Sequence, residues 1–180
     1  LPATETELIN IQSLFSKKRS KIFVKEEATE GILRRSNLEN YKVVSFATHG
    51  LMAGEYDQVS EPSLILTPGN IKYSSDDGIL TSGEIRRLNI NANLVILSAC
   101  NTTSSSGKPD GASFSGLIDA FFLSGVRSVA ATQWTVYSKA AQILASNMIK
   151  ASIDENIGVS ASLRKSMLRF ISNSPDGLSA

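Results

Sequence analysis

Three short, nearly continuous apolar segments, each followed by a turn or loop and then by a helical pattern, constrain the fold most strongly. They are Tyr41–Thr48, Asn93–Ala99 and Arg127–Thr132. Apolar runs of this length are typical of strands that are buried on both faces, as in parallel sheets. Because these strands alternate with helices along the chain, we expect crossover connections and helices on both faces of one sheet. The sequence therefore predicts a three-layer α/β/α fold with a mostly parallel central sheet.

Further elements are predicted from apolar spacing, capping residues and turn signals. The predicted helices run from about Glu5 to Phe15, Thr29 to Ser36 with Thr29 as a cap, Gly83 to Leu88 with Ser82 as a cap, Asp110 to Ser124 with Phe121 and Phe122 on its buried side, Ser138 to Asp154, and Gly158 to Ser172. The predicted short strands are Lys21–Val24, Leu64–Thr67, Ile71–Tyr73 and Ile79–Thr81, and Thr102–Pro109 is predicted to be a mobile loop. We see no linker long enough to separate two domains, so residues 1–180 are predicted to form one domain.

Composition excludes several classes of function. Lys and Arg number 18 against 17 Asp and Glu, which gives a net charge of +1 and no basic excess for nucleic acid. One Cys and one His cannot form an internal disulfide or a structural zinc site, so we predict no metal and no cofactor. The longest apolar runs are far shorter than the ~20 residues of a membrane helix, and the N-terminus has no signal-peptide pattern. A cytoplasmic protein without a membrane partner is the resulting expectation.

The single His and the single Cys each follow a predicted buried strand. His49 comes after Tyr41–Thr48, and Cys100 comes after Asn93–Ala99. If these strands are neighbours in a parallel sheet, both side chains emerge at the same edge and form a candidate nucleophile–base pair. Taken singly, each residue also fits a structural role, because a lone Cys after an apolar run is often a small buried hydrophobe. The pattern alone leaves both interpretations open.

Several segments together resemble the CHAT domain, a bacterial branch of the caspase-like cysteine peptidases related to the separases. Two strand-end motifs carry the resemblance, and matching segments lie between and after them. These are Ser45–Gly50 (SFATHG), Leu97–Thr102 (LSACNT), Asp77–Thr81 with Glu84-Ile85, Gly111, Leu123–Val126, and Arg127–Val129 with Trp134. The resemblance covers nearly the whole chain, and the two strand-end motifs together are specific.

The resemblance implies a caspase-like fold with His49 and Cys100 as a catalytic dyad that cleaves a protein or peptide substrate. The Cys100 thiolate would attack the scissile carbonyl, and His49 would lower the thiol pKa and protonate the leaving amine. The backbone N–H groups of Gly50 and Cys100 would form the oxyanion hole, and the missing side chain of Gly50 would allow substrate to approach. Related domains often follow helical repeats of the tetratricopeptide type, which are a candidate partner region in a longer chain.

The chain departs from the family pattern in two places. Related peptidases that cut after a basic residue usually carry Asp shortly after a Trp-x-Val segment, whereas Trp134-Thr135-Val136 is followed by Tyr137. An uncharged residue before the cut is therefore plausible, with Trp134 as a pocket wall or a core aromatic and Tyr137 beside it. Asp76, Asp77 and Asp110 are candidate acidic pocket groups. The family domain also generally extends further towards the N-terminus. We therefore expect that this chain lacks the N-terminal part of the family domain and is a fragment or a processed subunit.

Three functions follow from these observations. The first is a cysteine endopeptidase that uses the His49–Cys100 dyad. The second is a catalytically latent protein-interaction module of the CHAT type, which the missing Asp and the short N-terminus favour. The third is a thiol enzyme such as an acyl transferase, since the same dyad and oxyanion hole would serve it.

Overall fold

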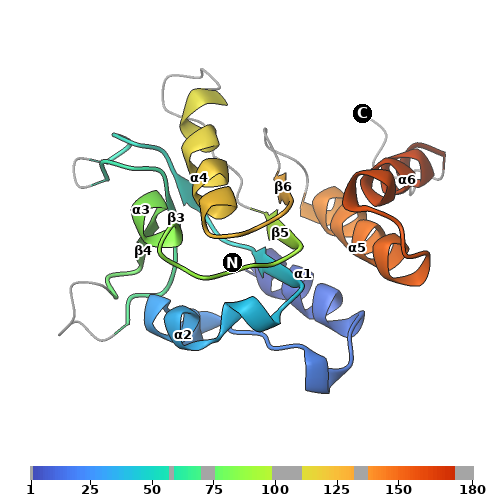
Figure 1. Ribbon diagram of the computed structural model, residues 1–180, viewed down its shortest axis with the longest axis horizontal. Coiled ribbons are helices and arrows are strands. Elements are labelled where there is room, and N and C mark those ends of the chain that lie inside the picture. The colour runs from blue at the N-terminus through green and yellow to red at the C-terminus, as the bar shows by residue number, and fades with distance from the viewer. Residues whose placement is uncertain (1, 57–58, 70–75, 99–110, 132–137, 173–180) are drawn as a thin grey trace. The chain divides into compact units, whose positions relative to one another are not determined.

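The computed structural model describes residues 2–56, 59–69, 76–98, 111–131 and 138–172, which belong to two compact units (Figure 1). One unit combines Leu1–Ile22 with Val136–Ala180, and the other is Phe23–Thr135. The single domain expected from the sequence stays a prediction.

The first unit is helical. Its elements are α1 (Pro2–Ser13), the short 3-10 helix η1 (Lys17–Arg19), α5 (Ser138–Asp154) and α6 (Val159–Ser172). Helices α5 and α6 form a hairpin in which the Ser166 hydroxyl donates to the Leu144 carbonyl over 3.0 Å. Helix α1 packs on α5, where the Gln142 side-chain amide donates to the Thr6 carbonyl over 3.4 Å. The three α-helices confirm the helices predicted at both ends of the chain.

The second unit contains a three-stranded parallel sheet. Its strands are β1 (Val43–Phe46), β5 (Leu94–Leu97) and β6 (Val129–Ala131), in the order β1-β5-β6. All three lie within the continuous apolar segments, and every residue of the central strand β5 is buried. Continuous apolar character thus predicted these strands correctly, because a central parallel strand is covered on both faces.

A second sheet of three antiparallel strands follows β1. It contains β2 (Gly50–Leu51), β3 (Ser63–Ile65) and β4 (Ile79–Thr81), in the order β2-β3-β4. The sequence predicted β3 and β4 but not the two-residue strand β2, which depends on pairing with β3. The chain therefore has a mixed α/β fold with a mostly parallel main sheet flanked by helices, consistent with a caspase-like fold, and a separate small antiparallel sheet.

Both sheets share one hydrophobic core with four helices of this unit. These helices are α2 (Glu30–Arg35), α3 (Ser82–Ile85), α4 (Gly111–Leu123) and the 3-10 helix η3 (Leu38–Asn40), whereas the 3-10 helix η2 (Lys25–Glu27) is exposed. Helix α4 contributes Phe121, whose ring lies 5.6 Å from that of Phe46 in β1. Leu64 of β3 and Leu80 of β4 join the same cluster. A single apolar core therefore fixes the two sheets relative to each other.

Four element predictions need correction or lie outside the described residues. Lys21–Val24 is not a strand, because the chain turns into η2 and Lys25 adopts a positive φ of 53°. The cap of α3 is Thr81 and not Ser82, and the helix ends at Ile85. The predicted strand Ile71–Tyr73 and the predicted loop Thr102–Pro109 lie outside the described residues.

Candidate functional site

His49 lies where the chain passes from the parallel sheet to the small antiparallel sheet. Strand β1 ends at Phe46, three residues before His49, and β2 begins at Gly50. The His49 residue is exposed, although its neighbours in β1 are partly or fully buried. The His49 side chain is therefore accessible to solvent, while its backbone links β1 of the parallel sheet to β2 of the antiparallel sheet.

Two hydrogen bonds to Ile65 of β3 fix the backbone around His49. The Ile65 amide donates to the His49 carbonyl over 2.9 Å. The Thr48 hydroxyl donates to the Ile65 carbonyl in the opposite direction. The backbone at His49 is thus hydrogen-bonded to β3, and a catalytic side chain needs a backbone that is held in this way.

The backbone N–H of Gly50 points away from β3. In an antiparallel pair the N–H and C=O of one residue point to the same side, and the side alternates from one residue to the next. The His49 carbonyl faces β3 because it accepts from Ile65, and Gly50 pairs with Leu64 in that register. The N–H of Gly50 is therefore directed away from β3, the one strand that pairs with β2 among the described residues, to the side where it can donate to a ligand.

The parallel pairing of β1 and β5 aligns the carboxyl ends of these two strands. Phe46 pairs with Leu97, and the Ser98 amide donates to the Phe46 carbonyl over 2.9 Å. The two strands that precede His49 and Cys100 are therefore neighbours in a parallel sheet, as the sequence argument required. Cys100, the predicted nucleophile, follows Ser98 by two residues but lies outside the described residues.

The predicted substrate-binding residues Asp110, Trp134 and Tyr137 also lie outside the described residues. Of the predicted site, the structure thus describes His49 and Gly50, which are adjacent in the chain at the start of β2. It also describes the acidic pocket candidates Asp76 and Asp77, which precede β4 and accept from the Gly31 and Ile79 amides.

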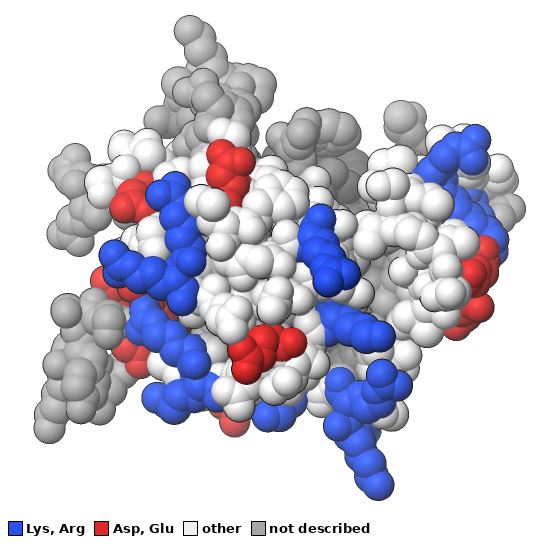
Figure 2. Space-filling model, in the orientation of Figure 1, with Lys and Arg blue, Asp and Glu red and all other residues white. Residues whose placement is uncertain are grey.

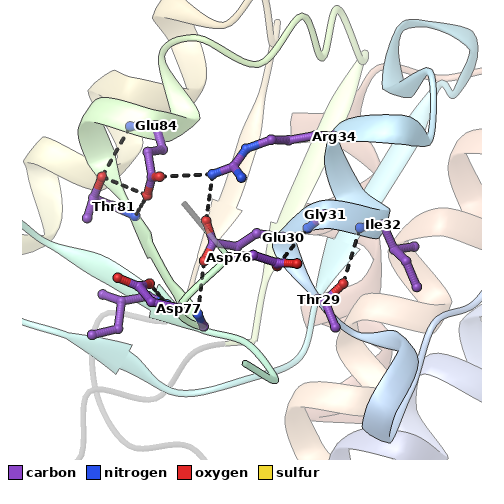
Figure 3. Close-up of polar contacts among 11 residues, drawn as sticks. Thr29, Glu30, Gly31, Ile32, Arg34, Asp76, Asp77, Thr81 and Glu84 are labelled. Atoms are coloured by element: carbon purple, nitrogen blue, oxygen red, sulfur yellow. Dashed lines mark hydrogen bonds and ion pairs between the residues drawn. The ribbon is translucent and has the colours of Figure 1, made fainter. Parts of the chain in front are cut away.

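Helix α2 supplies a buried carboxylate next to the turn before β4, and the sequence did not single it out. The side chain of Glu30 is 0% exposed. Its Oε1 accepts from the Gly78 amide over 3.0 Å, and its Oε2 accepts from Arg34 Nη2 over 2.7 Å. The same Arg34 nitrogen reaches Glu84 Oε1 in α3 over 2.9 Å (Figure 3). One guanidinium is therefore shared between two carboxylates that come from different helices.

Burial raises the pKa of Glu30 to about 7, since a buried carboxylate loses its hydration. The negative charge of Glu84 and, less strongly, that of Asp77 also raise it. The hydrogen bond from Gly78 and the charge of Arg34 act in the opposite direction but do not outweigh burial. Glu30 is thus a buried acid that changes its charge near neutral pH.

The turn before β4 surrounds this carboxyl group with further acidic side chains (Figure 3). Asp76 Oδ1 accepts from the Gly31 amide over 2.9 Å, and Asp77 Oδ1 accepts from the Ile79 amide over 2.8 Å. Gly78 has a φ of 87°, and a Cβ there would lie 2.9 Å from the Leu66 carbonyl oxygen. Only glycine therefore suits the position that donates to Glu30.

The surface over α2 and α3 is largely basic on the face drawn in Figure 2. Arg35 ends α2, and Arg86 and Arg87 directly follow α3, and all three are exposed. Arg34 differs from them because it contacts both Glu30 and Glu84. Of these four arginines, the described ion pairs therefore join Arg34 to the carboxylates of Glu30 and Glu84.

Sequence reasoning missed Glu30, Arg34 and the Thr48–Ile65 contact. One signal was present, because Glu30 and Arg34 stand four residues apart, the spacing of ion pairs on a helix. The burial of Glu30 had no sequence signal, since its partner Gly78 lies 48 residues away. The capping box of α3, in which Thr81 and Glu84 bond each other's backbone amides, had the usual Thr-x-x-Glu pattern.

Comparison with protein families matches residues 1–177 to the CHAT domain. The chain therefore belongs to the CHAT domain family, which is related to the caspase-like peptidases. Comparisons with curated proteins and with solved structures gave no match. Within the described ranges, no helix is long and apolar enough to cross a membrane. The same ranges contain no group of three His, Cys, Asp or Glu residues that would suit a metal ion.

Proposed function

We propose that this chain is a cysteine endopeptidase that cleaves a protein or peptide substrate through His49 and Cys100. The observation that carries the proposal is the parallel pairing of β1 and β5. Because Phe46 and Leu97 are partners in adjacent strands, the residues that follow both strands leave the sheet at one edge. Membership of the CHAT domain family supports the same assignment.

The reaction begins with the transfer of the Cys100 thiol proton to the His49 imidazole. The thiolate attacks the carbonyl carbon of the scissile peptide and forms a tetrahedral oxyanion. The oxyanion accepts hydrogen bonds from backbone amides, for which the outward N–H of Gly50 is one donor in this proposal. Protonated His49 then gives its proton to the leaving amine as the carbon–nitrogen bond breaks.

Water completes the cycle. His49 takes a proton from a water molecule, whose oxygen attacks the thioester carbon. The carbon–sulfur bond breaks, the carboxylic acid leaves, and Cys100 recovers its proton from His49. The hydrogen bonds between Thr48, His49 and Ile65 support this role, because the base must keep its orientation through both proton transfers.

The test compares the full chain with its Cys100→Ala and His49→Ala variants on a proteome-derived peptide library, with new N-termini identified by mass spectrometry. Cleavage that needs both residues is the expected result. The Glu39→Ala variant is a suitable control, because Glu39 is an exposed side chain of η3 that bonds Asn89. Identical products from wild type and Cys100→Ala would contradict the proposal.

Two other functions are outcomes of the same experiment. If wild type and Cys100→Ala both bind peptides and neither cleaves them, the result would support a latent interaction module of the CHAT type. Turnover of thioesters or esters without peptide cleavage would support an acyl transferase.

A further inference from the structure

A short path of backbone hydrogen bonds connects the buried carboxyl group of Glu30 with the backbone of His49. Glu30 Oε1 accepts from the Gly78 amide over 3.0 Å, and the Gly78 carbonyl accepts from the Leu66 amide over 2.8 Å. The residue before Leu66 is Ile65, whose amide donates to the His49 carbonyl over 2.9 Å. After the Glu30 carboxylate, each hydrogen bond of the path joins planar peptide groups, and the path crosses only the Cα atoms of Gly78 and Ile65.

We propose that Glu30 is a positioning residue that holds His49 in place through the peptide groups of Gly78, Leu66 and Ile65. The inference rests on the proposed function, since positioning matters only if His49 acts on a substrate. Glu30 itself does not touch the reacting atoms. It acts by fixing the turn before β4, against which the end of β3 is hydrogen-bonded.

The position of Gly78 explains why this carboxyl group matters. The positive φ of Gly78 turns its N–H towards Glu30 of α2 and its C=O towards Leu66. Gly78 therefore links the helix to the end of β3. A buried amide that loses its acceptor is costly, because no water replaces the lost hydrogen bond. Without the Glu30 oxygen, the turn would move to solvate the Gly78 amide, and Leu66 would move with it.

The charge state of Glu30 gives this contact a dependence on pH. The groups that face it are Arg34 on its own helix, Glu84 on α3, and Asp77 in the turn before β4, and Asp76 in that turn bonds the adjacent Gly31 amide. One guanidinium shared by Glu30 and Glu84 leaves an excess of negative charge when both carboxyl groups are ionised. A protonated Glu30 accepts hydrogen bonds more weakly than a carboxylate, so the hold on Gly78 weakens as the pH falls below neutral.

Two further contacts join the segment before α2 to the end of β3 without Glu30. The Thr67 amide donates to the Ala28 carbonyl over 2.9 Å, and the Thr67 hydroxyl donates to the Lys25 carbonyl over 2.6 Å. Because these bonds remain, we expect a Glu30 variant to fold with α2 in place. The effect of the variant should then concentrate at Gly78, Leu66 and Ile65.

The test is an NMR comparison of the full chain with Glu30→Ala and Glu30→Gln, with Glu39→Ala as the matched control. In Glu30→Ala, we expect amide hydrogen exchange at Ile65 and Leu66 to accelerate about tenfold or more relative to Val95 in β5. The ring signal of His49 should move as well, and it is assigned without ambiguity because the chain has one histidine. Glu30→Gln keeps an acceptor oxygen for Gly78 and should restore most of the wild-type exchange.

A pH titration gives a readout that a merely stabilising role would not move. In wild type, the amide nitrogen shifts of Gly78 and Ile65 should share one inflection near pH 7, which disappears in Glu30→Gln. The proposal is overturned if Ile65, Leu66 and the His49 ring behave in Glu30→Ala as they do in Glu39→Ala. An inflection at Gly78 that does not reach Ile65 would overturn it too. If Glu30→Ala does not fold, this titration with Glu30→Gln decides the question.

Alkylation of Cys100 separates failure of this inference from failure of the proposed function. A slower reaction in Glu30→Ala at pH 7, with rescue in Glu30→Gln, is expected if both hold. A Cys100 that reacts at the same rate with and without the His49 imidazole contradicts the dyad, whereas the exchange data still decide whether Glu30 positions His49.

Discussion

The parallel sheet is stabilised mainly by apolar side chains. The turn before β4 of the small antiparallel sheet is also joined to α2 by a buried hydrogen bond, and an ion pair joins α2 to α3. Strand β5 is buried throughout and packs between β1 and β6. The turn before β4 is instead held by Glu30, and Glu84 caps α3 while it contacts Arg34. The side chains of the first region contribute stability mainly through burial, whereas those of the second also contribute through charge and therefore depend on pH.

This difference matters because His49 lies at the junction of the two regions. Its position along the edge is set by β1, and its carbonyl is held by Ile65 of β3. Substitutions in either region should affect His49, but in different ways. Truncation of an apolar core side chain should reduce the stability of the whole fold, whereas substitution of Glu30, Arg34 or Glu84 should act more locally.

The largest effect is expected from Phe121→Ala. Phe121 is 0% exposed and packs against Phe46, so its truncation leaves a cavity between α4 and the parallel sheet. We expect a loss of about 3–5 kcal/mol in the free energy of unfolding, measured by urea denaturation and circular dichroism. Phe122→Ala is the matched control on the same helix, because Phe122 is 48% exposed and should cost under about 1 kcal/mol. Equal losses in the two variants would contradict this description of the core.

The next effect concerns pH. The pKa of Glu30 is about 7 in the folded chain against 4.5 for the free group, so the folded state binds more protons between these values. Folding stability should therefore fall as the pH rises from 5 to 8, by on the order of 3 kcal/mol. Glu61, whose pKa is lowered by hydrogen bonds from Ser82 and Gly83, acts in the opposite direction and only at lower pH.

Urea denaturation at pH 5, 6, 7 and 8 measures this dependence in wild type and in Glu30→Gln. The difference between the two proteins isolates Glu30 from the other titrating groups. A difference that does not change with pH would show that Glu30 does not titrate in this range.

The smallest effect is expected at the capping box of α3. The Thr81 hydroxyl accepts from the Glu84 amide, and the Glu84 carboxylate accepts from the Thr81 amide. Thr81→Ala should cost about 1 kcal/mol, at least as much as Thr29→Ala, which removes the single cap bond of α2 to the Ile32 amide. A larger loss in Thr29→Ala would contradict the importance assigned to the reciprocal box.

The sequence predicted the parallel sheet well because its information is local. Continuous apolar runs mark β1, β5 and β6, and helical periodicity with end signals placed α5 at Ser138–Asp154 as observed. Apolar spacing did not separate Phe121 from Phe122, since both were expected on the buried side of the helix. Their exposure depends on how α4 lies against the core, which one helix pattern does not contain.

The small antiparallel sheet and its contacts with α2 could not be predicted as fully, because these contacts join segments that are distant in the sequence. Strand β2 has two residues and exists through its pairing with β3, so no local pattern marks it. Glu30 looks like an ordinary helical glutamate until the turn at Gly78 covers it. His49 and Gly50 were found through the motif at the end of β1, whereas the hydrogen bonds that hold them were not.

The measurement that tests the dyad most directly is the rate of alkylation of Cys100 by iodoacetamide from pH 5 to 9, in wild type and in His49→Ala. The single Cys makes the reaction site unambiguous, and Glu39→Ala serves as a control. The proposed dyad predicts an inflection well below the free-thiol value of about 8.5, which moves upward in His49→Ala. An inflection near or above that value, unchanged by the loss of the imidazole, would contradict it.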